Sequence, residues 1–253
     1  MTKPKLSITQ PDGSRKYVHP LTGETVPSVT TVMRYLPQQH WKVDWALRMA
    51  AQHATANWLR LSKEPHSVRL QEMMAAHETY AQERADVGDI VHDLVEAWSI
   101  GTPYPDPPKN VNGYINQFID FLTTERPEFI ENEVTLWSRT YGYAGTADFI
   151  VKIGGRTLLA DLKTGKNLHD EIGLQLSALS EANFILRVDG TEEAIPVIDG
   201  LAGLHLRPRS WKLVEISYAR ECFECFLHAK GVMEWMEEIA PNILPTRGWT
   251  RTR

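Results

Sequence analysis

Two acidic residues and one lysine occupy positions from which they could act together. Asp148 lies in residues 146–153, and Asp161 and Lys163 lie near the end of the next apolar segment, residues 156–163. Each segment has the composition of a β-strand, and the glycine pair between them is typical of a tight hairpin turn. We therefore expect an antiparallel pair of strands that brings Asp148 close to Asp161.

The alternation of side chains along a strand decides which of these groups share a face. Asp161 and Lys163 should point to one side of the strand, and Ala160 and Leu162 to the other. Two carboxylates that approach each other without a cation would repel. Carboxylate oxygens, a backbone carbonyl such as that of Leu162, and water are ligands that suit Mg²⁺ or Mn²⁺. The pattern predicts a divalent-metal site.

A metal site of this kind indicates hydrolysis of a phosphodiester. The reaction needs a water that is nucleophilic near neutral pH and positive charge beside the phosphoryl oxygens, and a bound metal can supply both. Lys163 lies two residues from an expected metal ligand, and two roles are open to it. Its ammonium can contact the scissile phosphate or, if its pKa is lowered, it can help to deprotonate the attacking water.

Four motifs, in this order, resemble the PD-(D/E)xK nuclease superfamily, in particular its phage-type, RecB-like exonuclease branch. The family pattern is a helix with a histidine after a glycine, a Gly-Thr-x-Asp strand, an Asp-x-Lys-Thr-Gly strand end, and a helix with a glutamine. The corresponding residues here are Gly88 to His92, Gly145 to Asp148, Asp161 to Gly165, and Gln175. The resemblance covers roughly residues 84–181, and residues 27–32 and 206–208 are weaker similarities.

The resemblance implies a role for each matching residue. Asp148 and Asp161 would be metal ligands, and Leu162 would be a ligand through its carbonyl. Lys163 would be the catalytic lysine. His92 would be an additional metal ligand, whereas its position at the flank of an apolar helical stripe is more often that of a structural histidine.

Glu133 and Gln175 are further candidates for the same site. Glu133 lies at a position similar to that of a glutamate in RecB-like proteins; it is a metal ligand, a partner of metal-bound water, or a solvated strand residue. The amide of Gln175 can orient Lys163 or contact a phosphate, with an ordinary surface role as the alternative. The family often has a tyrosine four residues after the glutamine, where this chain has Leu179.

The overall pattern predicts an α/β protein with a restriction-endonuclease-like core, in which a mixed central sheet is flanked by helices and preceded by an N-terminal helical region. We divide the chain into residues 1–126, an extended segment and helical region with the His92 motif, and residues 127–253, the nuclease core, which form one catalytic unit. The expected helices are residues 40–61, 67–100 with a break near Gly88, 111–124, 169–186 and 222–239. The expected strands are residues 129–138, 146–153, 156–163, 204–206 and 211–216; residues 1–37 should be mostly extended, and residues 190–203 should be an insertion.

Composition restricts the class of protein. The chain has 253 residues and 42% hydrophobic content, enough for one substantial domain, and its net charge of −5 means that nucleic acid would need a local basic groove. The two cysteines are too few for an iron–sulfur cluster held by four thiolates of one chain. No N-terminal apolar run resembles a signal peptide or a membrane span, which favours a cytoplasmic protein without membrane contact. Candidates for phosphate contacts are Arg207, Arg209, Lys212, Arg247, Arg251 and Arg253.

The leading hypothesis is a Mg²⁺- or Mn²⁺-dependent DNA exonuclease that acts on DNA ends in recombination or repair. Its expected partner is DNA that is single-stranded or has free ends, and a separate helicase or recombinase could join it. Two alternatives remain open: a non-catalytic DNA-end-binding module of a recombination complex, and an endonuclease on the same fold.

Overall fold

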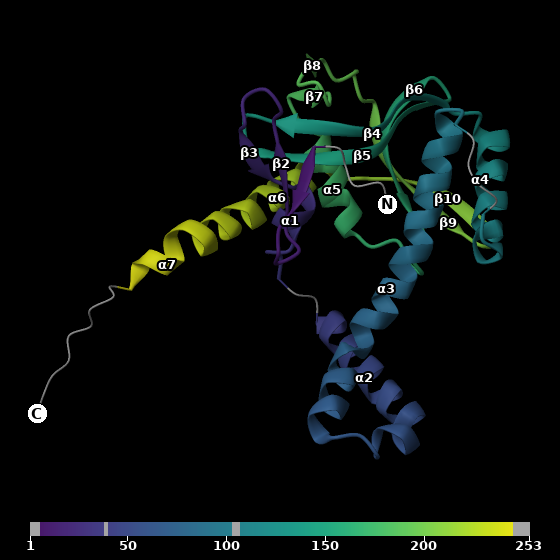
Figure 1. The fold of residues 1–253 in the computed structure, drawn as a ribbon. Helices are drawn as coiled ribbons and strands as arrows, with labels where there is room; N and C mark the ends of the chain where they lie inside the picture. Colours follow the sequence, from purple (N-terminus) through teal and green to yellow (C-terminus); the bar gives the residue numbers. More distant parts are fainter. Residues whose placement is uncertain (1–5, 38–39, 103–106, 245–253) are drawn as a thin grey trace, which may run out of the picture.

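A mixed β-sheet forms the centre of the molecule (Figure 1). The computed structural model describes residues 6–37, 40–102 and 107–244, and within them the sheet has seven strands in the order β10-β9-β6-β5-β4-β7-β8. The strands are β4 (Glu128–Ser138), β5 (Tyr143–Ile153), β6 (Arg156–Lys163), β7 (Phe184–Leu186), β8 (Glu192–Glu193), β9 (Gly200–Arg207) and β10 (Ser210–Glu215). Strands β6 and β9 pair in parallel and the other neighbours pair antiparallel, so the expected mixed sheet of an α/β protein is confirmed.

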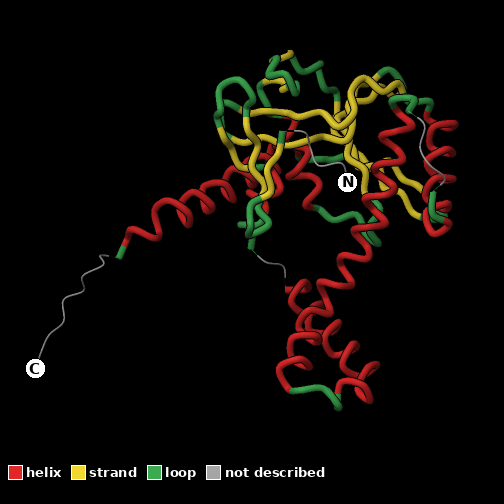
Figure 2. The backbone as a smooth tube through the Cα atoms, in the orientation of Figure 1, coloured by secondary structure: helices red, strands yellow, loops and turns green. Residues whose placement is uncertain are grey.

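Helices cover both faces of this sheet (Figure 2). On one face lie α1 (Val29–Met33), α5 (Glu171–Ser180) and α6 (Ala219–Glu234); on the other lie α3 (His66–Ser99), η1 (Lys109–Val111) and α4 (Asn112–Glu125). Neighbouring side chains of β6 point to opposite faces of the sheet. Leu159 packs with the first group of helices, and Leu158 and Ala160 pack with the second. Residues from both sides of the expected boundary at 126/127 share these two cores. No helix in the described ranges is long and apolar enough to cross a membrane.

A second, three-stranded sheet packs beside the central one. It consists of β1 (Ser7–Thr9), β2 (Arg15–Val18) and β3 (Thr25–Pro27), and Tyr17 of β2 is buried against Trp137 of β4. The expectation that residues 1–37 are mostly extended is wrong at α1. Ser28 caps this helix by accepting a hydrogen bond from the backbone N–H of Thr31, and the cap outweighs the strand preference of the β-branched run that follows.

A helical arm extends from the core (Figure 1). It is formed by α2 (His40–Leu61), packed against the first part of α3. Helix α3 continues without interruption through Gly88, so the expected break is wrong. A glycine inside a helix costs about 1 kcal/mol relative to alanine. At Gly88 the missing side chain allows a close contact instead, because a Cβ there would lie 3.1 Å from Thr164 Oγ1.

Two further expectations in the second half of the chain are wrong. The helix expected at residues 169–186 ends at Ser180, and the three apolar residues 184–186 form β7, which pairs with β4. A short apolar run has no periodicity that separates a strand from a helix. Residues 190–203 are not an insertion, because they contain β8 and the first half of β9. The glycines of β9 have low strand propensity, and Gly203 allows a close approach of α5, since a Cβ there would lie 2.7 Å from Ile172 Cδ1.

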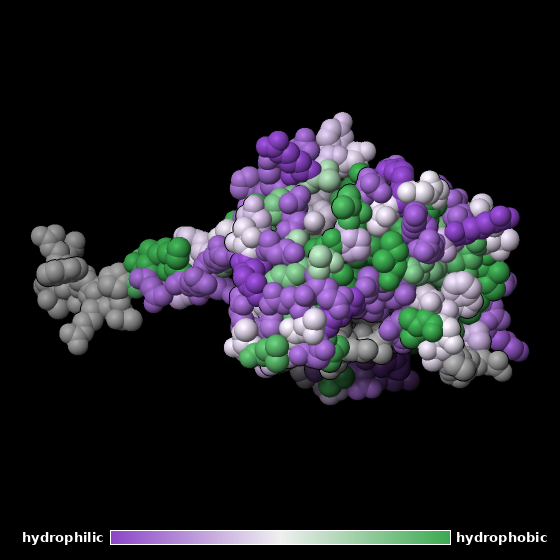
Figure 3. All heavy atoms as spheres, turned by 90° about the horizontal axis from the view of Figure 1, so that it is seen from above, coloured by the Kyte–Doolittle hydropathy of each residue, from purple (hydrophilic) through white to green (hydrophobic). Residues whose placement is uncertain are grey.

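The C-terminal helical segment projects from the core (Figures 1 and 3). The helix expected at residues 222–239 is α6 continued by a π-helical turn, η2 (Trp235–Ile239), and by the short α7 (Ala240–Ile243). Seen from above, an apolar patch covers the end of this projection in Figure 3, where Ile243 and Leu244 are exposed.

Candidate metal and active site

The site begins where the hairpin of β5 and β6 opens. The two strands pair from Ile153–Arg156 at the glycine turn to Phe149–Ala160, and their ladder ends there. Beyond that point the backbone N–H of Leu162 donates a hydrogen bond to Asp148 Oδ2, with a distance of 2.6 Å. The carboxylate of Asp148 therefore occupies a position that a backbone carbonyl would take in a continuous ladder. The expected hairpin is confirmed, and its open end anchors Asp148.

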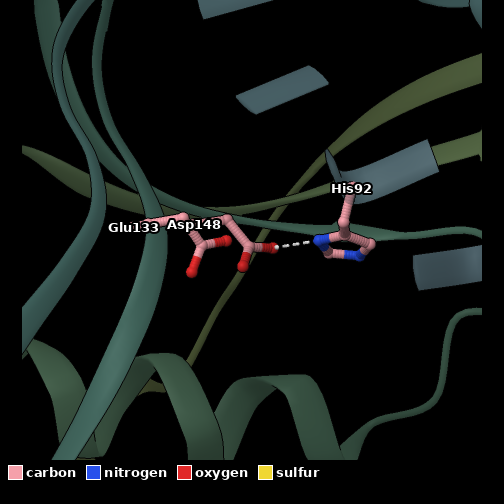
Figure 4. Close-up of side chains that lie close together, drawn as sticks. All are labelled: His92, Glu133 and Asp148. Carbon is pink, nitrogen blue, oxygen red and sulfur yellow. Dashed lines mark ion pairs between the residues drawn. The ribbon is translucent and has the colours of Figure 1, made fainter. Parts of the chain in front are cut away.

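Three side chains converge at this open end, and we call His92, Glu133 and Asp148 the acidic cluster. They come from α3, β4 and β5, and one nitrogen or oxygen atom from each lies within 4.8 Å of the others. His92 Nδ1 is 3.6 Å from Asp148 Oδ2. Figure 4 shows the imidazole and the two carboxylates pointing toward one another. Of the two acids expected to share a cation, Asp148 belongs to this cluster, and Glu133 accompanies it.

The backbone of Glu133 is unusual for a strand residue. Its φ of 47° lies in the left-handed region, which costs a non-glycine residue about 1–3 kcal/mol. The neighbouring residues Asn132 and Val134 pair with Phe149 and Ala147 of β5, so Glu133 lies across from Asp148. A strained conformation of this kind persists only where the surroundings fix it, and it is concentrated at functional sites.

The two carboxyl groups of the acidic cluster oppose each other electrostatically. Burial, reinforced by the charge of Asp148, raises the pKa of Glu133 to about 8. Burial and the charge of Asp161 together raise the pKa of Asp148 to about 6, against the opposing effects of His92 and Lys163. An imidazole nitrogen and two carboxylates that lack sufficient positive charge fit a divalent cation.

Asp161 has a different environment. Its side chain is only 2% exposed, and its Oδ2 lies 2.5 Å from Lys163 Nζ. Gln175 of α5 bridges the two residues, since its Nε2 donates to Asp161 Oδ1 at 2.7 Å and its Oε1 accepts from Lys163 Nζ at 3.3 Å. We call Asp161, Lys163 and Gln175 the ion-paired group. The carboxylate expected to be a second metal ligand is thus engaged by a lysine and an amide.

The charge of Lys163 follows from this arrangement. Burial by itself would lower the pKa of its ammonium, but the attraction of Asp161 and Asp148 outweighs burial and the pKa is raised. Of the two roles open to Lys163, the proton acceptor requires a lowered pKa. The environment favours the other role, a fixed positive charge.

A pocket of about 260 Å³ contains both groups of residues. Leu162 also lines it, and so do Arg15 and Tyr17 of β2, the N-cap residue Ser28 and Thr30 of α1. Only the weak similarity of residues 27–32 pointed to this wall. The hydroxyl of Tyr17 is 2.8 Å from Thr146 Oγ1 of β5, which joins the small sheet to the strand that carries Asp148.

Leu179 lies where the family often has a tyrosine. It is buried and lines the same pocket. A Cβ on Gly145 would come within 2.8 Å of Leu179 Cδ2, so the leucine packs directly on the backbone of β5. In this chain the position therefore fixes the distance between α5 and β5.

The expected phosphate contacts are only partly described, because Arg247, Arg251 and Arg253 lie outside the described residues. Arg207 donates hydrogen bonds to backbone carbonyl oxygens of the turn after β6.

Comparisons of the sequence with protein-family models and with curated proteins found no match. The functional argument therefore depends on the geometry and chemistry of the pocket.

Proposed function

We propose that this protein is a Mg²⁺- or Mn²⁺-dependent nuclease with a restriction-endonuclease-like core, and that it hydrolyses phosphodiester bonds at DNA ends. One observation carries the proposal: within one pocket, the acidic cluster of His92, Glu133 and Asp148 adjoins a lysine held by Asp161. A cation site beside a fixed ammonium can supply both the nucleophilic water and the positive charge that phosphodiester hydrolysis needs. The preference for DNA ends depends on the resemblance to RecB-like exonucleases.

The acidic cluster would hold the metal. His92, Glu133 and Asp148 supply one imidazole nitrogen and two carboxylates. The carbonyl of Leu162 is a further candidate, because the N–H of the same residue already points to Asp148, and in a strand both groups of one residue face the same neighbour. A bound divalent cation supplies Lewis acidity and a water that is nucleophilic near neutral pH.

The ion-paired group would stabilise the charge that develops on the phosphate. Asp161 and Gln175 hold the Lys163 ammonium in one place, so no reorganisation is needed when negative charge grows on the phosphoryl oxygens. We therefore assign Asp161 primarily to holding the Lys163 ammonium. Glu133 takes the metal-ligand position beside Asp148. Gln175 then acts by orienting Lys163.

Digestion of end-labelled DNA tests the proposal. Purified protein would be stripped with a chelator and mixed with single-stranded, linear duplex and covalently closed circular DNA, with and without Mg²⁺ or Mn²⁺. We expect degradation of linear DNA only with added metal, and no cutting of the circle. Cutting of the circle would indicate an endonuclease, and metal-independent binding without cutting would indicate an end-binding module. An intact linear substrate in the presence of bound metal would contradict the proposal.

A further inference from the structure

Strand β9 carries two side chains that reach beyond the end of β6. In the parallel pairing of these strands, Lys163 lies beside His205, so Arg207 lies beyond the last paired residue. Arg207 Nη1 donates to the carbonyl oxygens of Thr164, at 3.0 Å, and of Gly165, at 2.7 Å. His205 Nε2 lies 2.8 Å from the Gly165 oxygen, and since a carbonyl can only accept, this nitrogen is the donor.

The turn that they hold touches both parts of the candidate site. Thr164 and Gly165 directly follow Lys163 and line the pocket. Thr164 also lies against Gly88 of α3, where a Cβ would approach its Oγ1 to 3.1 Å. His92 is one helical turn further along α3. The position of the turn therefore affects the lysine on one side and the histidine on the other.

We propose that Arg207, assisted by His205, is a positioning residue for this site. A guanidinium that donates to two successive carbonyl oxygens makes charge-assisted hydrogen bonds and selects one conformation of the turn. That conformation sets where Lys163 leaves β6 and how closely α3 approaches, and thus where the imidazole of His92 meets its carboxylates. The catalytic part of this inference depends on the proposed nuclease function, but the positioning of the turn and of the metal ligands does not.

Two substitutions of Arg207 in the full-length chain test the inference, with one matched control. Arg207→Ala removes both hydrogen bonds, whereas Arg207→Lys keeps a cation without the planar, two-point donor. The control is Arg156→Ala, at the opposite end of the β6–β9 pair. Arg156 also donates to a backbone carbonyl, that of Asp199 at 3.3 Å, but it is remote from the turn.

Three measurements separate positioning from general stability. They are backbone hydrogen exchange in residues 164–168, Mn²⁺ affinity by calorimetry, and kcat and KM on labelled DNA. For Arg207→Ala we expect faster exchange in the turn, and losses of about 10–100-fold in Mn²⁺ affinity and kcat, the range typical of residues that support metal ligands. KM should change by less than about threefold. Arg207→Lys should recover part of each loss, and Arg156→Ala should cause none of them.

Several outcomes would overturn the inference. Unchanged exchange in the turn, or unchanged Mn²⁺ affinity, would remove the role of Arg207 in positioning. A higher KM with kcat unchanged would make Arg207 a direct phosphate contact instead. Equal losses in Arg156→Ala would reduce the effect to stability. If the unmodified protein cuts no DNA, the proposed function fails, while exchange and Mn²⁺ affinity still decide this inference.

Discussion

The two halves of the pocket contain the same kind of acid in opposite electrostatic conditions. Asp161 is buried, but its charge is met within the chain by Lys163 and Gln175. Glu133 and Asp148 lie close to His92, and both carboxyl groups have raised pKa values. The ion-paired group is therefore electrostatically complete as it stands, whereas the acidic cluster requires positive charge from outside the chain. Substitutions in the two halves should consequently have effects of opposite sign.

The largest expected effect comes from a pair of Asp-to-Asn substitutions. Asp148→Asn removes a repelling charge and keeps an oxygen for the Leu162 N–H, so in a chelator its melting temperature should rise. Asp161→Asn removes the buried carboxylate that Lys163 and Gln175 hold, and it leaves the lysine without its counter-charge, so the melting temperature of this variant should fall. Asp148→Asn should also lose the stabilisation by Mn²⁺, about 2.7 kcal/mol at a hundred times the dissociation constant. We expect both variants to lose DNA cleavage by about 10³-fold or more.

Thermal unfolding with a chelator and with Mn²⁺ provides the measurement for this pair. A shift of the same sign for the two variants in the chelator would refute the contrast between the two halves of the pocket. Retained stabilisation of Asp148→Asn by Mn²⁺ would refute the assignment of Asp148 as a ligand.

The next effect distinguishes the proposed metal ligands from the Lys163 ammonium beside them. Lys163→Met should lower kcat by about 10²–10³-fold, the usual cost of removing one group that stabilises a developing charge. Its stabilisation by Mn²⁺ should remain, because Lys163 is not a member of the acidic cluster. Kinetics on labelled DNA and thermal unfolding, performed on the same preparation, check the two parts. Loss of both kcat and stabilisation by Mn²⁺ would mean that the acidic cluster and the ion-paired group do not act separately.

The pH dependence of stability gives a smaller effect. The pKa of Glu133 is raised from 4.5 to about 8, so between these values the folded chain holds a proton that the unfolded chain has released. Stability without metal should therefore fall as pH rises through this range, by on the order of 10 °C in melting temperature. Glu133→Gln should flatten the curve of melting temperature against pH measured in a chelator. A curve with the same slope as that of the unmodified protein would contradict the raised pKa of Glu133. Saturating Mg²⁺ should oppose the fall, because ligation requires the deprotonated carboxylates.

The smallest expected effect compares two helical glycines. Gly231→Ala in α6 has open space around the new Cβ and should raise stability by about 0.5–1 kcal/mol. Gly88→Ala gains the same helix propensity but presses on Thr164, so its stability should rise less and its Mn²⁺ affinity should fall a few-fold. Denaturant unfolding and calorimetry measure the two quantities. Equal gains in stability with unchanged Mn²⁺ affinity would show that the contact between α3 and the turn does not matter to the cluster.

Local periodicity predicted the part of the site that depends on one hairpin. The glycine pair at 154–155 adopts the positive φ values that a tight turn needs, and the shared face of Asp161 and Lys163 follows from strand alternation. Ala160 and Leu162 are buried on the opposite face, as that alternation requires. These features depend on residues close in sequence, and the information needed for them is local.

The remainder depends on contacts between distant segments. The resemblance named Glu133 as a candidate ligand, but its position in the acidic cluster depends on a left-handed backbone conformation and on the opening of β5 from β6, which no side-chain pattern predicts. The contribution of Arg15 and Tyr17 requires the N-terminal sheet to pack against β5, across more than a hundred residues of chain. The first half of strand β9 was missed because its two glycines have low strand propensity; Gly203 lies against Ile172 of α5, and Gly200 lies against Arg156 and Leu158.

The unbroken course of α3 has a mechanical consequence. Its 34 residues form a rod roughly 50 Å long, and Gly88 lies against Thr164 between the two ends of the helix. His92 is about 6 Å from that point on one side, and His66 is about 33 Å from it on the other. A tilt that swings the far end by about 5 Å therefore displaces His92 by only about 1 Å. A small tilt of the arm about this contact would therefore leave the imidazole close to its carboxylates.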